Sequence, residues 1–222
     1  MDEVLFQRLQ ELCKSAGFTK KGKAFFRVWG DGVLQVIKCQ YERVFRADML
    51  YVGLHSMYAP LQPRDFTATG CIVRYPIALC YYLNEFPMLF APSMEAQLDM
   101  LKNGVISWLS TIDTQKKLVT AISKLDGQWN DSAKIGPFLA CGEHNHAKKV
   151  IKEIVGSYSY AMVRSVRPKD ATAEDMIARG RQEKEPYYGI IEIIDRGEDA
   201  IAAYLQANFE ENMRCAKFCV RK

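Results

Sequence analysis

The sequence lacks long hydrophobic runs. No stretch approaches the roughly 20 consecutive apolar residues that an α-helix needs to cross a bilayer. The first 18 residues are amphipathic and include acidic side chains, whereas a secretory signal peptide has a basic start and an apolar centre. We therefore expect a cytoplasmic protein with no membrane association.

Recognisable catalytic and cofactor motifs are also missing. The segment Gly30-Asp31-Gly32 lacks the Lys-Ser/Thr ending of a phosphate-binding loop. Dinucleotide fingerprints, Gly-x-Ser-x-Gly elbows and His-Glu-x-x-His pairs do not occur in the 222 residues. Common enzyme classes are thus disfavoured, and we assign no catalytic residue and no cofactor.

The seven cysteines follow no disulfide or metal pattern. Their number is odd, and several lie in apolar runs, where free cysteine commonly behaves as a small buried hydrophobe. Cys141, His144 and His146 form a short group of metal-type ligands. No second pair with zinc-site spacing accompanies them. We expect reduced thiols and no bound metal.

The charge balance gives weak guidance about partners. The net charge is +4, from 30 basic and 26 acidic residues, and the basic residues are spread along the chain. Proteins that bind nucleic acids usually concentrate positive charge on one face. Nucleic acid is therefore a disfavoured partner, and an acidic protein remains compatible with the composition.

The first 90 residues predict a helix followed by an antiparallel sheet. The apolar positions of the helix have a spacing of three to four residues, and Gly17 provides its end. An Asp-Gly pair at 31–32 separates two strand-like runs, which is a strong hairpin signal because type I′ turns need positive φ. The strand candidates are 24–29, 33–41, 49–57 and 71–75. Residues 77–83 either extend the sheet or begin a helix.

Beyond residue 90 the apolar residues change from alternating to helical spacing. Ser93 is a plausible N-cap for a helix that reaches Ile112, and Asp113 for the next one. A turn-rich stretch is expected at 126–137. Further predicted elements begin near 147, span 172–184 and 190–194, and begin near 198.

These patterns predict an α+β fold. It consists of an N-terminal helix and an antiparallel β-sheet of three to five strands, followed by a helical C-terminal half. We expect a sheet domain at 1–90 and a helical region at 91–222 packed on it, either as a second domain or within one continuous core.

The N-terminal third resembles a known family. The similar residues are Ala16-Gly17-Phe18-Thr19-Lys20-Lys21-Gly22, Phe25-Phe26-Arg27 and Gly30-Asp31-Gly32-Val33-Leu34-Gln35-Val36-Ile37. They resemble DUF 4304, an uncharacterised bacterial domain family with no established activity. Some of its relatives resemble small proteins encoded near bacterial toxins. The resemblance therefore implies an immunity or interaction role, without implying any catalytic residue.

Cationic and aromatic residues on neighbouring strands suggest a binding surface. If the sheet leaves their face open, it would suit a nucleotide, a single strand or an acidic protein. An ordinary solvated face with some helical cover is the simpler interpretation. The candidate binding residues are Arg27, Trp29, Lys38, Tyr51, His55 and Arg74.

Three functions remain open on the sequence alone. We favour a non-enzymatic binding protein of the toxin-immunity type, because of the resemblance and the missing catalytic motifs. The alternatives are a small-molecule or nucleic-acid binder that uses the sheet face, and an enzyme with an unrecognised site.

Overall fold

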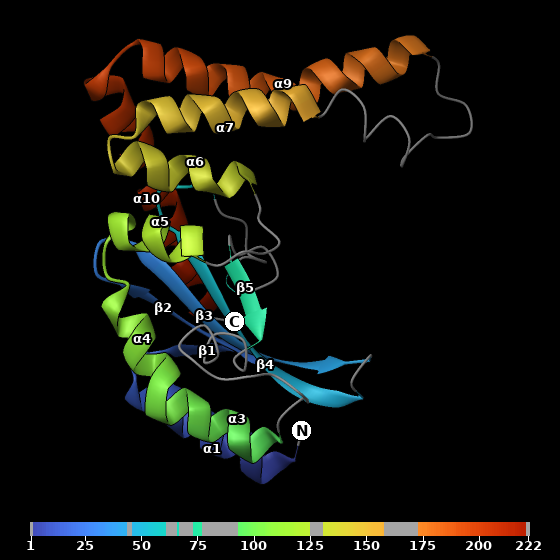
Figure 1. Ribbon diagram of the computed structural model, residues 1–222, viewed down its shortest axis with the longest axis vertical. Helices are drawn as coiled ribbons and strands as arrows, with labels where there is room; N and C mark the ends of the chain where they lie inside the picture. Colours follow the sequence, from blue (N-terminus) through green and yellow to red (C-terminus); the bar gives the residue numbers. More distant parts are fainter. Residues whose placement is uncertain are drawn as a thin grey trace.

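The computed structural model describes residues 2–43, 46–60, 66, 73–76, 93–124, 131–157 and 173–220. It confirms the predicted α+β fold: an N-terminal helix, an antiparallel sheet and a mainly helical C-terminal half (Figure 1). Helix α1 (Glu3–Ser15) begins at the N-cap Asp2 and ends before Gly17, whose φ is 80°. Among the described helices, none is both long enough and apolar enough to cross a membrane.

The sheet has five antiparallel strands in chain order. They are β1 (Thr19–Lys21), β2 (Ala24–Trp29), β3 (Val33–Glu42), β4 (Ala47–Ser56) and β5 (Val73–Pro76). The predicted hairpin is confirmed, because β2 pairs with β3. The expected type I′ turn is wrong: Gly30 and Gly32 have positive φ, whereas Asp31 does not. A Cβ at Gly30 would lie 2.0 Å from the Asp113 carbonyl oxygen, so the turn needs glycine there. Residues 77–83 lie outside the described residues.

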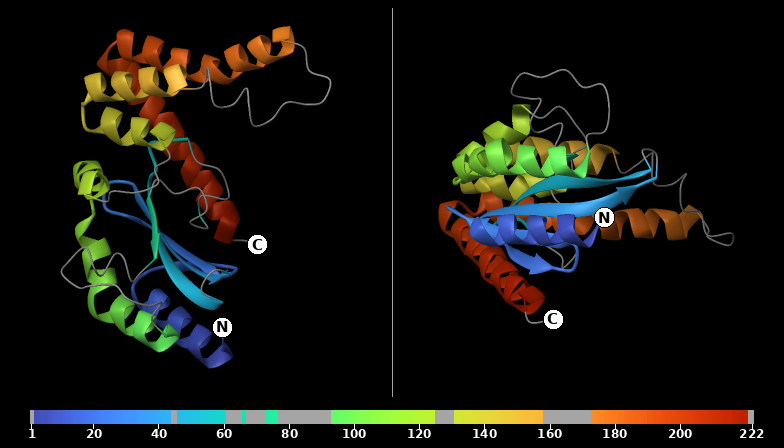
Figure 2. Two further views of the ribbon diagram at one scale, coloured as in Figure 1. Left: turned by 45° about the vertical axis from the view of Figure 1, so that its right-hand side comes forward. Right: turned by 90° about the horizontal axis from the view of Figure 1, so that it is seen from below.

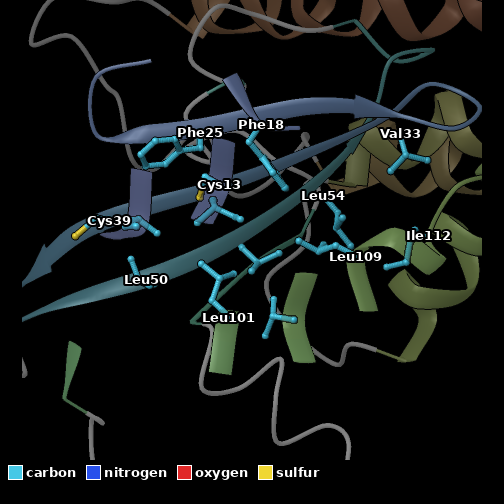
Figure 3. Packing of buried hydrophobic residues seen from close by; sticks show 14 of the residues in the cluster. Cys13, Phe18, Phe25, Val33, Cys39, Leu50, Leu54, Leu101, Leu109 and Ile112 are labelled. Carbon is cyan, nitrogen blue, oxygen red and sulfur yellow. The ribbon is translucent and has the colours of Figure 1, made fainter. Parts of the chain in front are cut away.

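One face of the sheet, here called the α1 face, carries the main hydrophobic core. It is covered by α1 and by a helical segment made of α3 (Met94–Met100), the π-helical turn η2 (Leu101–Val105) and α4 (Ile106–Thr111). Figure 3 shows side chains from α1, the strands and this segment converging, among them Phe25, Leu54 and Leu109. Ser93 caps α3, as predicted, through its side-chain oxygen. One continuous helix to Ile112 was expected, but the π turn interrupts it.

The opposite face, here called the α10 face, packs against the last helix, α10 (Glu198–Val220). Figure 2 shows α10 crossing the sheet on the side away from α1 and α4. Phe209 and Met213 contact the cluster that contains Leu34 and Val36. The Asn212 side-chain amide donates to the main-chain carbonyls of Met57 and Ala59, each at 2.7 Å. This helix is therefore fixed to the chain leaving β4 by both apolar contacts and hydrogen bonds.

The remaining helices are α5 (Gln115–Lys124), α6 (Asp131–Ala140), α7 (His144–Ser157) and α9 (Ala173–Asp195). Helices α6, α7 and α9 form, with the first part of α10, a helical layer around a third apolar cluster. Figure 1 shows α7 and α9 at the far end of the molecule from α1.

Two expectations for this layer were wrong. Residues 131–137 were expected in a turn-rich stretch but belong to α6, with Pro137 inside the helix. Residues 173–195 were expected as two segments but form one helix that contains Pro186. Proline removes one main-chain donor and disfavours a helix interior. Here buried apolar residues on both sides, such as Ile135 and Leu139 around Pro137, favour continuing the helix.

Candidate functional site

The strand register divides the six predicted binding residues between the two faces of the sheet. Arg27 lies opposite Gln35, which lies opposite Leu54, and these positions belong to the α1 face together with Trp29. Lys38 lies opposite Tyr51, and His55 lies opposite Leu34, on the α10 face. Arg74 lies opposite Gly53 in β5, and only its place in the strand is described. The expectation of one surface lined by all six is wrong, because neighbouring residues of a strand point to opposite faces.

Arg27 is an internal brace. Its guanidinium donates to Gln35 Oε1 at 2.8 Å, to the Ala16 carbonyl oxygen at 2.6 Å and to Ser110 Oγ at 3.0 Å. It also lies 4.5 Å from the Phe18 ring centroid and 4.2 Å from that of Trp29. One side chain therefore joins β2, β3, the end of α1 and the end of α4.

The environment of Arg27 explains why it does not present a free charge. The residue is buried, and no described carboxylate lies within ion-pair distance of it. Burial lowers the pKa of its guanidinium, and the nearby Cys13 thiol acts weakly in the opposite direction. The Trp29 indole, partly exposed, donates to the Ser110 carbonyl oxygen at 3.0 Å. Both residues thus hold the sheet to α4.

His55 is also part of the interior. Its Nδ1 accepts a hydrogen bond from the Ser56 main-chain N–H at 2.8 Å, and the residue is buried. Burial lowers the pKa of His55 to about 4, against a smaller raising effect of the contact between Nδ1 and the Ser56 carbonyl oxygen at 3.1 Å. The ring is therefore neutral at physiological pH and adds no positive charge to the α10 face.

Lys38 and Tyr51 are half-buried and lie beside an acid. The Tyr51 hydroxyl donates to Glu42 Oε1 at 2.7 Å, and the Gln40 amide donates to the same oxygen at 2.8 Å. A carboxylate next to Lys38 and Tyr51 disfavours a bound anion by like-charge repulsion. Tyr51 instead connects β4 to the end of β3 through Glu42.

Those ends form a projecting structure that the sequence reasoning did not single out. Among the described residues, β2 pairs with β3 as far as Lys38 and β5 pairs with β4 as far as Tyr51, while β3 and β4 pair with each other as far as Glu42 and Ala47 (Figure 1). We call residues 39–43 and 46–50 the β3–β4 ribbon. Val44 and Phe45, which connect its two halves, lie outside the described residues. The sequence feature that could have indicated this ribbon is the length of its two strands, which have ten residues each, compared with six in β2.

The ribbon carries exposed aromatic and cationic side chains. Tyr41 is 57% exposed, which makes it the most exposed phenylalanine, tyrosine or tryptophan in the described part of the chain. Arg43 and Arg46 are exposed on either side of the turn. Arg46 has a φ of 49°, an uncommon value for a residue other than glycine.

A buried glutamine holds the ribbon in place. The Gln97 side chain of α3 accepts from the Leu50 main-chain N–H at 2.7 Å and donates to the Asp48 carbonyl oxygen at 3.2 Å. It thereby satisfies two main-chain groups on the outer edge of β4. Together with the Tyr51–Glu42 contact, this fixes the direction in which the ribbon projects.

The described thiols and histidines do not form a reactive centre. Burial raises the pKa of Cys13 to about 12 and that of Cys39 to about 11, so these thiols are protonated at neutral pH. His146 Nδ1 lies 2.8 Å from Glu143 Oε2, whereas His144 Nδ1 faces Glu198 Oε1 at 3.6 Å. Within the described ranges, no three such side chains are arranged to hold a metal ion.

Comparison with known proteins adds no relative. No family model matches the chain, and no match was found among curated proteins or solved structures. The candidate site therefore rests on the geometry of the ribbon.

Proposed function

We propose that this chain is a non-enzymatic protein-binding protein that contacts its partner through the β3–β4 ribbon. The observation that carries the proposal is the exposed Tyr41 on a projecting two-stranded structure, with Arg43 and Arg46 next to it. Tyrosine and arginine are enriched among the residues that contribute most to protein–protein affinity.

The internal contacts of the ribbon support this role. Gln97 holds the β4 side, and Glu42 accepts hydrogen bonds from Gln40 and Tyr51. A surface that is already ordered loses less conformational entropy on binding, so more of the contact energy is available as affinity. Tyr51, one of the predicted binding residues, thus contributes at the base of the ribbon.

The resemblance to DUF 4304 suggests the biological setting. An immunity-type protein would act by occlusion, with Tyr41 filling a pocket of a toxin and the arginines approaching its acidic groups. Charge complementarity of this kind accelerates encounter more than it raises affinity. No catalytic group of this chain is needed for such a mechanism.

The test compares two exposed tyrosines. The purified chain is used to capture partners from an extract of its native host, and the captured protein is identified by mass spectrometry. We expect Tyr41→Ala to weaken binding of that protein at least tenfold, or about 1.4 kcal/mol, by calorimetry. Tyr188→Ala is the matched control, because Tyr188 is 45% exposed on α9, away from the ribbon.

Two results would contradict the proposal. One is equal loss of affinity in both variants, which would point away from the ribbon. The other is repeated capture of no protein together with a small molecule that stays bound to the purified chain, which would favour a ligand-binding function.

A further inference from the structure

The turn of the β3–β4 ribbon holds an arginine in a backbone conformation that disfavours it. Glu42 pairs with Ala47, so residues 43–46 connect the two strands. Arg46 has a φ of 49°, and it is the only described residue other than glycine with a positive φ. In this left-handed region the Cβ of an L-residue crowds the main chain, a cost that glycine avoids. Glycine at position 46 would therefore form the same turn at lower energy.

The contacts of Arg46 within the chain do not account for this cost. Its side chain is exposed, and among the described residues none forms an ion pair or a hydrogen bond with its guanidinium. Glu42, an acid of the same ribbon, accepts instead from the Tyr51 hydroxyl and from the Gln40 amide. Residues in unfavourable backbone conformations cluster at functional sites. The cost at Arg46 therefore points to a use of its side chain in a contact with another molecule.

Arg43, at the other end of the turn, provides the comparison. It is also exposed, and its φ is not positive. Arginine has no unusual backbone cost there, so the attraction of an acidic partner during encounter is a sufficient role for its charge. The two arginines share their charge and their place on the ribbon, and they differ in backbone conformation.

We infer that Arg46 determines the specificity of the ribbon by forming a two-pronged ion pair with a carboxylate of the partner protein. The inference rests on the proposed function and goes further, because charge in that proposal mainly accelerates encounter. The planar guanidinium presents its N–H groups in a fixed fork that matches a carboxylate, which the ammonium of lysine cannot do. A partner without a carboxylate at this point would leave the guanidinium desolvated and unpaired. One arginine can in this way discriminate between partners.

The backbone part of the inference is tested without a partner. Arg46→Gly removes the side chain together with the cost of its left-handed conformation. Arg43→Gly removes the same side chain at a position where glycine only increases the freedom of the unfolded chain. In urea unfolding followed by circular dichroism, we expect a higher midpoint for Arg46→Gly than for Arg43→Gly. Equal falls in the midpoints of both variants would overturn the inference, because arginine would then have no special cost at position 46.

The binding test uses the protein that the natural chain captures and that mass spectrometry identifies. Arg46→Lys keeps the charge and loses the fork, and Arg43→Lys is the matched control. By calorimetry, we expect the dissociation constant to rise about tenfold or more for Arg46→Lys and less than about threefold for Arg43→Lys. Replacing one acidic residue of the captured protein by its amide should cause a similar loss. That replacement should add no further loss when it is combined with Arg46→Lys.

The outcomes separate this inference from the proposed function. Unchanged binding by Arg46→Lys together with a loss in Tyr41→Ala would overturn the inference and leave the proposed function standing. Unchanged binding by both variants would overturn both, because the ribbon would then not contact the captured protein. A loss in Arg46→Lys without one in Tyr41→Ala would support the role of Arg46 and remove Tyr41 as the main contact.

Discussion

The sheet with its covering helices and the helical layer are held together by different interactions. All seven buried polar or charged residues described in the chain lie in the strands or in helices that contact the sheet; one of them, Asn212 of α10, bonds to the segment after β4. None of these residues lies in the described parts of α6, α7 and α9, the helices that surround the apolar cluster of Ile151 and Ile201.

The difference shows how each region specifies its structure. Gln35 donates to the Leu109 and Ile112 carbonyl oxygens, and the Gln115 amide donates to that of Asp31. Each bond requires one geometry, because an unpaired buried polar group costs about 1–3 kcal/mol. Apolar burial has no such direction. The structure of the sheet region is therefore specified by directional hydrogen bonds between buried groups. The structure of the helical layer is specified by the shape and extent of its apolar surface.

Replacing Arg27 should give the largest effect. Arg27→Met keeps much of the apolar stem but leaves Gln35 Oε1 and the Ala16 carbonyl oxygen without their donor. We expect the free energy of unfolding to fall by about 1–3 kcal/mol for each buried acceptor that loses its donor. Urea unfolding followed by circular dichroism measures it. A loss below about 1 kcal/mol, the net value of one ordinary hydrogen bond, would contradict the role of Arg27 as the residue that holds these elements together.

Acid should destabilise the sheet region through His55. Its pKa in the folded state is about 4, below the ordinary value, so folding favours the neutral ring. Its contribution is complete above pH 6.5, the unfolded pKa, and is lost as the pH falls from there toward 4. The total is roughly 2–4 kcal/mol from the size of that shift.

The measurement is the free energy of unfolding against pH, for the natural chain and for His55→Leu. The variant should have a flatter profile between pH 6.5 and 4 because it lacks the titrating ring. Parallel profiles would show that the acid sensitivity arises from other groups.

Most of the sheet could be predicted from the sequence. The alternation of Leu50, Val52 and Leu54 with Tyr51 and Gly53 is a local pattern of period two, and it survives in the structure as two faces. The Ser93 cap is equally local, because its side chain bonds within its own helix. The Asp-Gly pair marked the turn locally, although the turn also contacts Asp113 and Gln115 far along the chain.

The placement of the site could not be predicted in the same way. Arg27 and Lys38 were assigned to one surface because both are cationic. Which face of the sheet each side chain reaches depends, however, on the register between β2 and β3, and the turn determines that register. Gln97 bonds to residues about 48 positions earlier, and nothing near it in the sequence indicates this. In α6, Pro137 gave a correct local reason to expect a break, and buried contacts from distant helices outweighed it.

The smallest effect should come from matched methylene deletions in the two regions. Ile37 in the sheet and Ile151 in the helical layer are both fully buried, and Ile→Val removes the same group from each. If the regions differ in their polar bonds and are alike in apolar packing, both variants should lose about 0.5–1.5 kcal/mol. Their difference should stay within about 0.5 kcal/mol, close to the error of additivity for distant sites. Urea unfolding of both variants, with the double variant as a check on additivity, measures this. If Ile37→Val alone costs more than twice as much as Ile151→Val, apolar packing also distinguishes the regions, and polar bonds alone do not account for the contrast.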